Sequence, residues 1–184
     1  RSDLMVVVAF GHVIPKKILE IPSYGAINVH ASLLPKYRGP APIQWAIING
    51  ETETGITTML MDAGLDTGEM LLSHRVDITS DDTGGTLHDR LSEVGASLLI
   101  DTIQKVIDGS LRPIPQNHAL SSYAPMLKKE DGHIDWKKPA DHIERFVRGM
   151  TPWPGAFTFV NGRRMRIFQA KIWDSSASDN PGKV

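Results

Sequence analysis

Short apolar segments that alternate with helical segments constrain the fold of this 184-residue chain more than any other feature. Residues 4–10 have the sequence Leu-Met-Val-Val-Val-Ala-Phe, and residues 26–30, Ala-Ile-Asn-Val-His, are expected to form the next buried strand. Continuous runs of this length, rich in β-branched residues, are typical of strands buried on both faces. The alternation predicts an α/β fold with a mostly parallel sheet. Further strands are expected over 55–61 and 69–78, and helices over 15–20, 41–49 and 86–109.

The clearest helical pattern lies within 86–109, where apolar residues recur at intervals of three and four. Thr86 is expected to cap the start of this helix, and Gly109 to end it. The residues expected on its buried face are Leu87, Leu91, Val94 and Leu98.

The second half of the chain has a different composition. Residues 110–125 hold three prolines and many polar residues, which is typical of a linker. A short amphipathic helix follows, and Asn161-Gly162 between two apolar stretches predicts a hairpin over 157–172. The chain starts inside an apolar run and stops where another strand is expected, so we expect a piece of a larger protein. The predicted divisions are an α/β domain over 1–109, a linker over 110–127 and a β-rich domain over 128–184.

Composition excludes several kinds of site. The chain has no cysteine, which rules out disulfides and thiolate metal sites. Its seven histidines show no metal-ligand spacing, and the motifs G-x-G-x-x-G, G-x-S-x-G and the Walker loop are absent. No stretch is long and apolar enough to span a bilayer, and no signal peptide opens the chain, so a cytoplasmic location is expected.

Charge is unevenly distributed along this chain, whose formal net charge is −1. Residues 128–171 hold ten Lys or Arg and five Asp or Glu, whereas the remainder holds ten basic and sixteen acidic residues. A basic C-terminal segment indicates a polyanionic partner, with a solvated charged surface as the alternative.

Asn28 and His30 occupy alternate positions at the end of the second strand, directly before a loop rich in proline and glycine. Alternate residues of a strand share a face, and ligands of open α/β sheets bind at the carboxyl ends of strands. An amide donor and an imidazole can together stabilise an oxyanion and move protons. Asp62 or Asp66, in the Gly-rich loop 62–68, can orient the histidine. The alternatives are a turn Asn, a buried structural His, and acids that only form a turn.

Two segments together resemble the folate-dependent formyltransferases. Residues 28–39 contain Asn-Val-His, Ser-Leu-Leu-Pro and Arg-Gly, and residues 61–68 have the sequence Met-Asp-Ala-Gly-Leu-Asp-Thr-Gly. The family pattern is an Asn, a His two residues later, and an Asp on a distant loop that contains glycine. The resemblance covers nearly the whole chain, with mild departures at Ala31, where the family has Gly, and at Pro40, where it has Ala.

This resemblance implies a Rossmann-like catalytic domain, of which the chain holds part, followed by the first strands of an OB-like β-barrel. It also implies that Asn28, His30 and Asp66 are catalytic and that the formyl donor is 10-formyltetrahydrofolate, with no metal. The folate pocket would be lined by Phe10, Gly11, Val13, Ile14, Ser32, Leu33, Leu34 and Pro35.

Within the family, the chain is most similar to members whose acceptor is the amino group of methionyl initiator tRNA. The resemblance therefore implies initiator tRNA as partner, and we expect a monomer. The basic residues expected to meet tRNA phosphates are Lys128, Lys129, Arg145, Arg148, Arg163, Arg164 and Arg166. Three alternatives stay open: an amino sugar on a nucleotide as acceptor, water as acceptor with release of formate, and a fragment that binds folate or tRNA without turnover.

Overall fold

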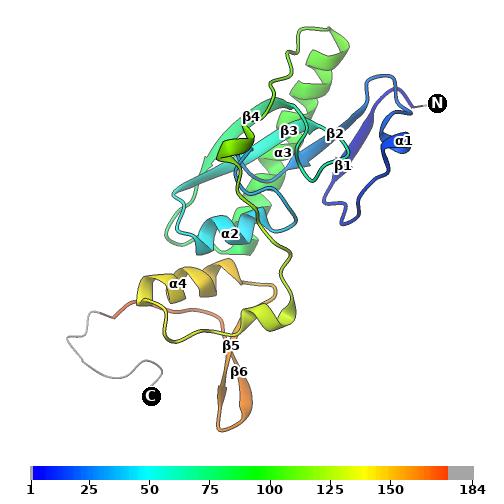
Figure 1. Ribbon diagram of the computed structural model, residues 1–184. Helices are drawn as coiled ribbons and strands as arrows, with labels where there is room; N and C mark the ends of the chain where they lie inside the picture. The colour runs from blue at the N-terminus through cyan, green and yellow to red at the C-terminus, as the bar shows by residue number, and fades with distance from the viewer. Residues whose placement is uncertain (1, 174–184) are drawn as a thin grey trace.

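The computed structural model describes residues 2–173, which form a sheet-containing part and a smaller part that ends in a hairpin (Figure 1). The main sheet has the strand order β1-β2-β3-β4. Its strands are β1 (Met5–Val8), β2 (Ala26–His30), β3 (Glu53–Leu60) and β4 (Met70–Asp77). The hairpin consists of β5 (Ala156–Val160) and β6 (Arg163–Ile167). The strand expected at the C-terminal end of the chain lies outside the described residues.

Within the described residues, four α-helices and two short 3₁₀ helices connect these strands. They are α1 (Lys16–Leu19), α2 (Pro42–Ile48), α3 (Gly84–Ile107), η1 (His118–Leu120), η2 (Lys129–Gly132) and α4 (Ala140–Gly149). The predicted α/β class is thus confirmed, and most element boundaries agree with the sequence to within a few residues.

The sheet is mixed, so the prediction of a mostly parallel sheet is wrong. β1 and β2 are parallel, whereas β3 is antiparallel to both β2 and β4. Loop 61–69, which joins β3 to β4, is shorter than the dozen or so residues that a parallel crossover needs. The connection from β2 to β3 contains α2, but this helix lies beyond the end of the sheet, next to α4, and not across its face (Figure 1).

Within the described residues, β1 lies at one side of the sheet. Val7 is buried, but Val8 is 58% exposed, and in the described residues β1 pairs with β2 alone. The strand buried on both faces is β3, which contains two fully buried threonines. Their hydroxyls are satisfied, because Thr57 donates to the carbonyl of Ser32 and Thr58 shares a hydrogen bond with Thr102 of α3.

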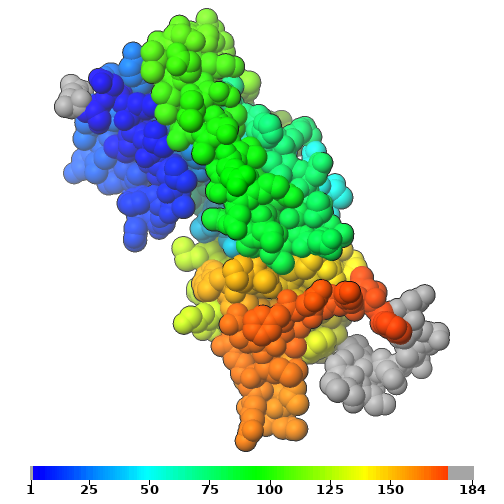
Figure 2. Space-filling model, turned by 180° about the vertical axis from the view of Figure 1, so that it is seen from behind, coloured from blue at the N-terminus to red at the C-terminus, as the bar shows by residue number. Residues whose placement is uncertain are grey.

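α3 covers the back of the sheet, where Figure 2 shows it in green beside the blue residues of β1 and α1. The predicted apolar face of this helix packs as expected, with Leu87, Leu91 and Leu98 buried against Ile56 of β3. The cap is Thr83 and not Thr86, because the two threonines form a reciprocal capping box in which Thr86 is the third helical residue. The helix ends before Gly109, whose φ is +70°.

The smaller part shares a core with the sheet-containing part. Ile48 of α2 packs in one cluster with Val147 and Met150, and the backbone of Gly149 approaches Ile48 so closely that a Cβ there would lie 2.7 Å from its side chain. In the hairpin, Asn161 and Gly162 both have positive φ, as a tight β-hairpin turn requires. β6 ends at Ile167, five residues before the predicted end. The division at 110–127 and the β-barrel remain predictions.

Asp82 lies just before α3, and its side chain connects Thr79 with Arg90 of this helix. Removing its charge is therefore expected to lower the stability of the protein. The buried carboxylate accepts hydrogen bonds from the Thr79 amide and from Arg90, each at 2.7 Å. Burial alone would raise the pKa of Asp82, but the bonds from Thr79 and Arg90 outweigh it and lower the pKa. Because the folded pKa is depressed, this stabilisation is present above the unfolded pKa of about 3.9 and is lost as pH falls through the folded value.

We therefore expect Asp82→Asn to lower the free energy of unfolding by about 1–3 kcal/mol at pH 7. The deficit should shrink toward pH 3, and urea unfolding at both pH values measures it. The neighbouring, exposed Asp81→Asn is the control and should change little at either pH. An equal loss for Asp82→Asn at both pH values would contradict a role for the carboxylate charge.

Candidate active site

β2 presents Asn28 and His30 at its carboxyl end. The two residues alternate along the strand and so lie on one face, opposite Met59 and Thr57 of the neighbouring strand β3. His30 is only 6% exposed, whereas Asn28 is half-buried. The strand therefore fixes the spacing of an amide and an imidazole at the carboxyl end of β2.

Asp66 reaches these two residues from loop 61–69. Asn28 Nδ2 donates to Asp66 Oδ1 at 3.3 Å, and His30 Nδ1 lies 3.7 Å from Asp66 Oδ2. Asp66 has a φ of +52°, a left-handed conformation that Asp and Asn tolerate better than most residues. The structure thus brings together three side chains that the sequence separates by up to 38 positions. Asp62, the other candidate, faces solvent and instead binds Thr67 of its own loop.

Tyr37, to which the sequence assigned no role, sets the protonation of one edge of His30. Its backbone carbonyl lies 2.8 Å from His30 Nε2, and because a carbonyl only accepts, Nε2 carries the hydrogen of this bond. The Tyr37 hydroxyl donates to Glu51 at 2.8 Å and accepts from Asn49. Burial of the side chain raises the pKa of Tyr37 to about 12, and the neighbouring Glu51 acts in the same direction. The hydrogen bond with Asn49 acts in the opposite direction but is outweighed. The phenol therefore stays protonated at neutral pH. Its bonds to Glu51 and Asn49 hold Tyr37 in place, and with it the backbone carbonyl that contacts His30.

Gly39, on the same loop as Tyr37, holds the carboxylate of Asp66. Its amide donates to Asp66 Oδ2 at 2.7 Å, and its φ is +110°. A Cβ at this position would lie 2.7 Å from the carbonyl oxygen of Ala124 and from the ring of Tyr123. Glycine is therefore required here on two counts, the positive φ and the close approach of another segment.

That other segment is the predicted linker, which returns across the site and is not detached from it. Gln116 is buried and contacts both the Asp66 loop and Arg38. Sequence reasoning missed Gln116, because three prolines and many polar residues around it are typical of a linker. A single glutamine in such a segment carries no local signal of burial.

The residues predicted to line a folate pocket fall into two groups. Phe10, Gly11 and Val13 are exposed, Val13 by 79%, and Ile14 is half-buried. The second group lies inside the fold: Ser32 is fully buried and donates to the carbonyl of Lys36.

The rest of the second group is also tied into the protein. Leu34 is buried, and its amide donates to Thr57 Oγ1 at 3.2 Å. Leu33 and Pro35 beside it are half-buried. The side chains of Ser32 and Leu34 therefore make intramolecular contacts, and the open surface lies at residues 10–14.

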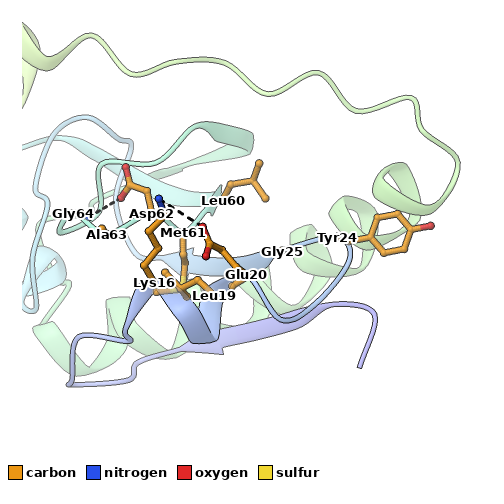
Figure 3. Close-up of a pocket in the computed structure, with 11 residues that line it drawn as sticks. Lys16, Leu19, Glu20, Tyr24, Gly25, Leu60, Met61, Asp62, Ala63 and Gly64 are labelled. Carbon is orange, nitrogen blue, oxygen red and sulfur yellow. Dashed lines mark hydrogen bonds and ion pairs between the residues drawn. The ribbon is translucent and has the colours of Figure 1, made fainter. Parts of the chain in front are cut away.

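Two cavities flank loop 61–69. The larger, about 570 Å³, lies between α1 and this loop, with Lys16 and Glu20 facing Asp62 across it (Figure 3). The second, about 400 Å³, is bordered by the same loop and by Gln116 and His118. Both cavities thus adjoin the loop that carries Asp66.

The basic residues predicted to meet tRNA also divide. Arg145 pairs with Asp141 at 2.8 Å, and Arg148 pairs with Glu144 and donates to the backbone carbonyl of Asp82. These two arginines are therefore engaged in intramolecular contacts. The remaining candidates are exposed on the smaller part of the molecule: Lys128, Lys129, Arg163, Arg164 and Arg166.

Within residues 2–173, no group of three or more His, Asp or Glu is arranged to hold a metal ion. None of the described helices is long and apolar enough to cross a membrane.

Comparison with family models identifies the chain. Residues 1–103 match the family described as formyl transferase, and residues 126–184 match its C-terminal domain. The chain belongs to the formyl transferase family. The Asn28, His30 and Asp66 cluster lies inside the first matched range.

Curated relatives of this chain are named methionyl-tRNA formyltransferase. A methionyl-tRNA formyltransferase from Citrifermentans bemidjiense is 54% identical over 184 residues, which is all of this chain and 57% of the relative. One from Caldanaerobacter subterraneus is 53% identical over the same length, with 60% of the relative covered. The chain thus spans a little over half the length of these relatives.

Several solved structures share the fold of this chain. HypX from Aquifex aeolicus, solved with tetrahydrofolic acid, matches 99% of this chain and 31% of its own with a TM-score of 0.80 and 21% identity. An N-formyltransferase from Helicobacter canadensis, solved with folinic acid and dTDP-3-aminofucose, matches 87% of this chain and 58% of its own with a TM-score of 0.73 and 25% identity.

Proposed function

We propose that the protein transfers a formyl group from 10-formyltetrahydrofolate to the amino group of methionyl initiator tRNA. The observation that carries this proposal is the convergence of Asn28, His30 and Asp66 at the end of β2, in a chain 54% identical to a methionyl-tRNA formyltransferase. A cytoplasmic location and a monomeric state, as expected from the sequence, accompany the proposal.

In the proposed reaction the methionyl amine attacks the formyl carbon and a tetrahedral intermediate forms. Asn28 Nδ2 carries two hydrogens, of which Asp66 Oδ1 accepts one. The second is free to donate to the oxyanion that develops on the formyl oxygen. Asp66 therefore orients the amide, while the amide stabilises the negative charge.

His30 moves the proton in this scheme. Its Nε2 edge is held by the Tyr37 carbonyl, so the exchangeable position is Nδ1, which faces Asp66 at a distance longer than a hydrogen bond. The attacking amine loses a proton and the folate nitrogen gains one when the carbon–nitrogen bond breaks. The Asp66 carboxylate stabilises the imidazolium that holds the proton between these two events.

We propose that folate binds between the exposed residues 10–14 and loop 61–69, next to the larger cavity. Such pockets are mainly apolar with a few fixed polar groups, and Phe10, Val13 and Ile14 would supply the apolar part. Ser32 and Leu34 would support the pocket by holding the backbone before Tyr37 in place.

The assay that tests the function measures formyl transfer to methionyl initiator tRNA from 10-formyltetrahydrofolate. We would use a chimaera in which this chain is flanked by the segments of the Citrifermentans bemidjiense relative that lie outside the match, with the 184-residue chain alone in parallel. Formyl-methionyl-tRNA made by the chimaera supports the proposal. Formyl transfer only to a dTDP-linked amino sugar, or release of formate without an amine, would overturn it.

The exposed arginines of β6 give a separate prediction about tRNA. We expect Arg163→Gln with Arg164→Gln to raise the KM for tRNA and leave kcat unchanged. The salt dependence of binding should also weaken, by roughly one unit of slope for each phosphate that the variant no longer neutralises. Arg75→Gln, an exposed arginine on β4 that pairs with Glu53, is the matched control. Equal KM values for the double variant and Arg75→Gln would argue against tRNA binding at the hairpin.

A further inference from the structure

We propose that Gln116, in the segment that returns from α3 across the site, is a positioning residue that holds the Asp66 loop in its reactive conformation. The inference rests on the proposed function for the role of Asp66. It adds a residue from a segment whose sequence has the composition of a linker.

The amide nitrogen of Gln116 holds the Asp66 loop directly. Nε2 donates to the backbone carbonyl of Asp66 at 2.9 Å and to that of Gly68 at 2.7 Å. Gln116 is 6% exposed, so these carbonyls would be left with little access to water if the donor were removed. One of the two acceptors is the carbonyl of Asp66 itself, the residue with positive φ, so the bonds hold the backbone from which the Asp66 side chain projects.

The amide oxygen of Gln116 is held from the opposite side. Arg38 donates to Oε1 from Nε at 3.1 Å and from Nη2 at 2.6 Å. The glutamine is therefore fixed at both ends of its amide, and its orientation cannot be reversed without breaking all four bonds. A cation on the acceptor also polarises the N–H donors and strengthens their bonds to the carbonyls.

The same segment also holds the loop that carries Tyr37 and Gly39. Ser122 accepts from the Tyr37 amide through its hydroxyl and from the Arg38 amide through its carbonyl, and the Ala124 amide donates to the Arg38 carbonyl. Both groups that contact the catalytic side chains, the Tyr37 carbonyl and the Gly39 amide, therefore lie on a loop tied to residues 116–124. Gln116 connects this loop to the Asp66 loop.

Gln116→Glu tests this role, since the carboxylate keeps the acceptor for Arg38 and removes both donors to the Asp66 loop. In the chimaera we expect kcat to fall about 10²-fold, as for a misplacement of about 1 Å at a reacting group, with the KM for tRNA nearly unchanged. Gln104→Glu, an exposed glutamine on α3, is the matched control and should have the kcat of the unmodified chimaera.

A double-mutant cycle separates positioning from a general loss of structure. If Gln116 acts through Asp66, adding Gln116→Glu to Asp66→Asn should cost little more than Asp66→Asn alone. Full additivity of the two effects, or an unchanged kcat for Gln116→Glu, would overturn the proposal. If Gln116→Glu does not fold, Gln116→Met removes the donors without adding a charge and is measured in the same cycle.

An NMR signal tests the positioning without turnover. The Gly39 amide donates to the Asp66 carboxylate, so its proton resonance should shift in Gln116→Glu toward the position seen in Asp66→Asn, and stay in place in Gln104→Glu. A Gly39 resonance unaffected by Gln116→Glu contradicts the inference whether or not the chimaera is active. Absence of formyl transfer with a Gln116-dependent Gly39 signal would reject the proposed function and retain the positioning.

Discussion

His30→Gln is expected to lower kcat for formyl transfer by about 10²–10⁴-fold, the range typical of removing a general acid–base group. Glutamine can keep a donor near the Tyr37 carbonyl, which His30 Nε2 contacts at 2.8 Å, but it cannot carry a proton between amine and folate. The effect should therefore appear in kcat, with little change in the KM for tRNA. Single-turnover assays with 10-formyltetrahydrofolate and methionyl initiator tRNA measure it.

The control for this variant is His88→Gln, a histidine exposed on α3 and paired with Asp89. It should have the kcat of the unmodified protein. A full rate for His30→Gln in folded protein would rule out proton transfer by this residue.

Asn28→Asp is expected to have the second large effect. The substitution keeps the shape of the side chain, removes the donor proposed for the oxyanion and places a second carboxyl group beside Asp66 Oδ1, which Asn28 now contacts at 3.3 Å. Removal of one oxyanion donor costs about 10²–10³-fold in kcat, and repulsion between the carboxylates should add to this. The measurement is kcat at several pH values.

A dependence on pH distinguishes the two causes. Protonation of one carboxyl group at lower pH relieves the repulsion, so the deficit of Asn28→Asp should be smaller at pH 6 than at pH 8. Asn117→Asp is the matched control, because Asn117 caps η1 through its side-chain oxygen, which aspartate retains. A deficit in Asn117→Asp as large as in Asn28→Asp would show that the change is not specific to the site.

The same local patterns that predict secondary structure also single out Asn28 and His30, but they leave Asp62 and Asp66 as alternatives for the third site residue. The position of Asn28 and His30 at a strand end follows from the apolar run before them, and the Gly-rich loop marks Asp66 as a turn residue. The prediction that linked these two segments came from the family resemblance. The hydrogen bond that spans 38 positions between Asn28 and Asp66 has no local signature.

The parts that could not be predicted depend on interactions between distant segments. Gln116 reaches Asp66 across 50 positions, and Ser122 reaches Tyr37 across 85. Composition describes such a segment as a linker, since burial of its polar groups depends on partners that lie elsewhere. In the same way, the sequence predicted Arg148 to be available for tRNA, whereas its guanidinium is paired with Glu144.

By itself, the sequence determined the α/β class, the approximate bounds of the strands and helices, the hairpin turn at Asn161-Gly162, and the Asn28 and His30 pair at the end of β2. These follow from backbone preferences and hydrophobic periodicity, which act over a few residues. Only the tertiary structure decided the antiparallel direction of β3 and the closure of residues 110–127 over the site. These depend on which surfaces and hydrogen-bonding groups meet across the folded chain, and neighbouring residues do not encode that.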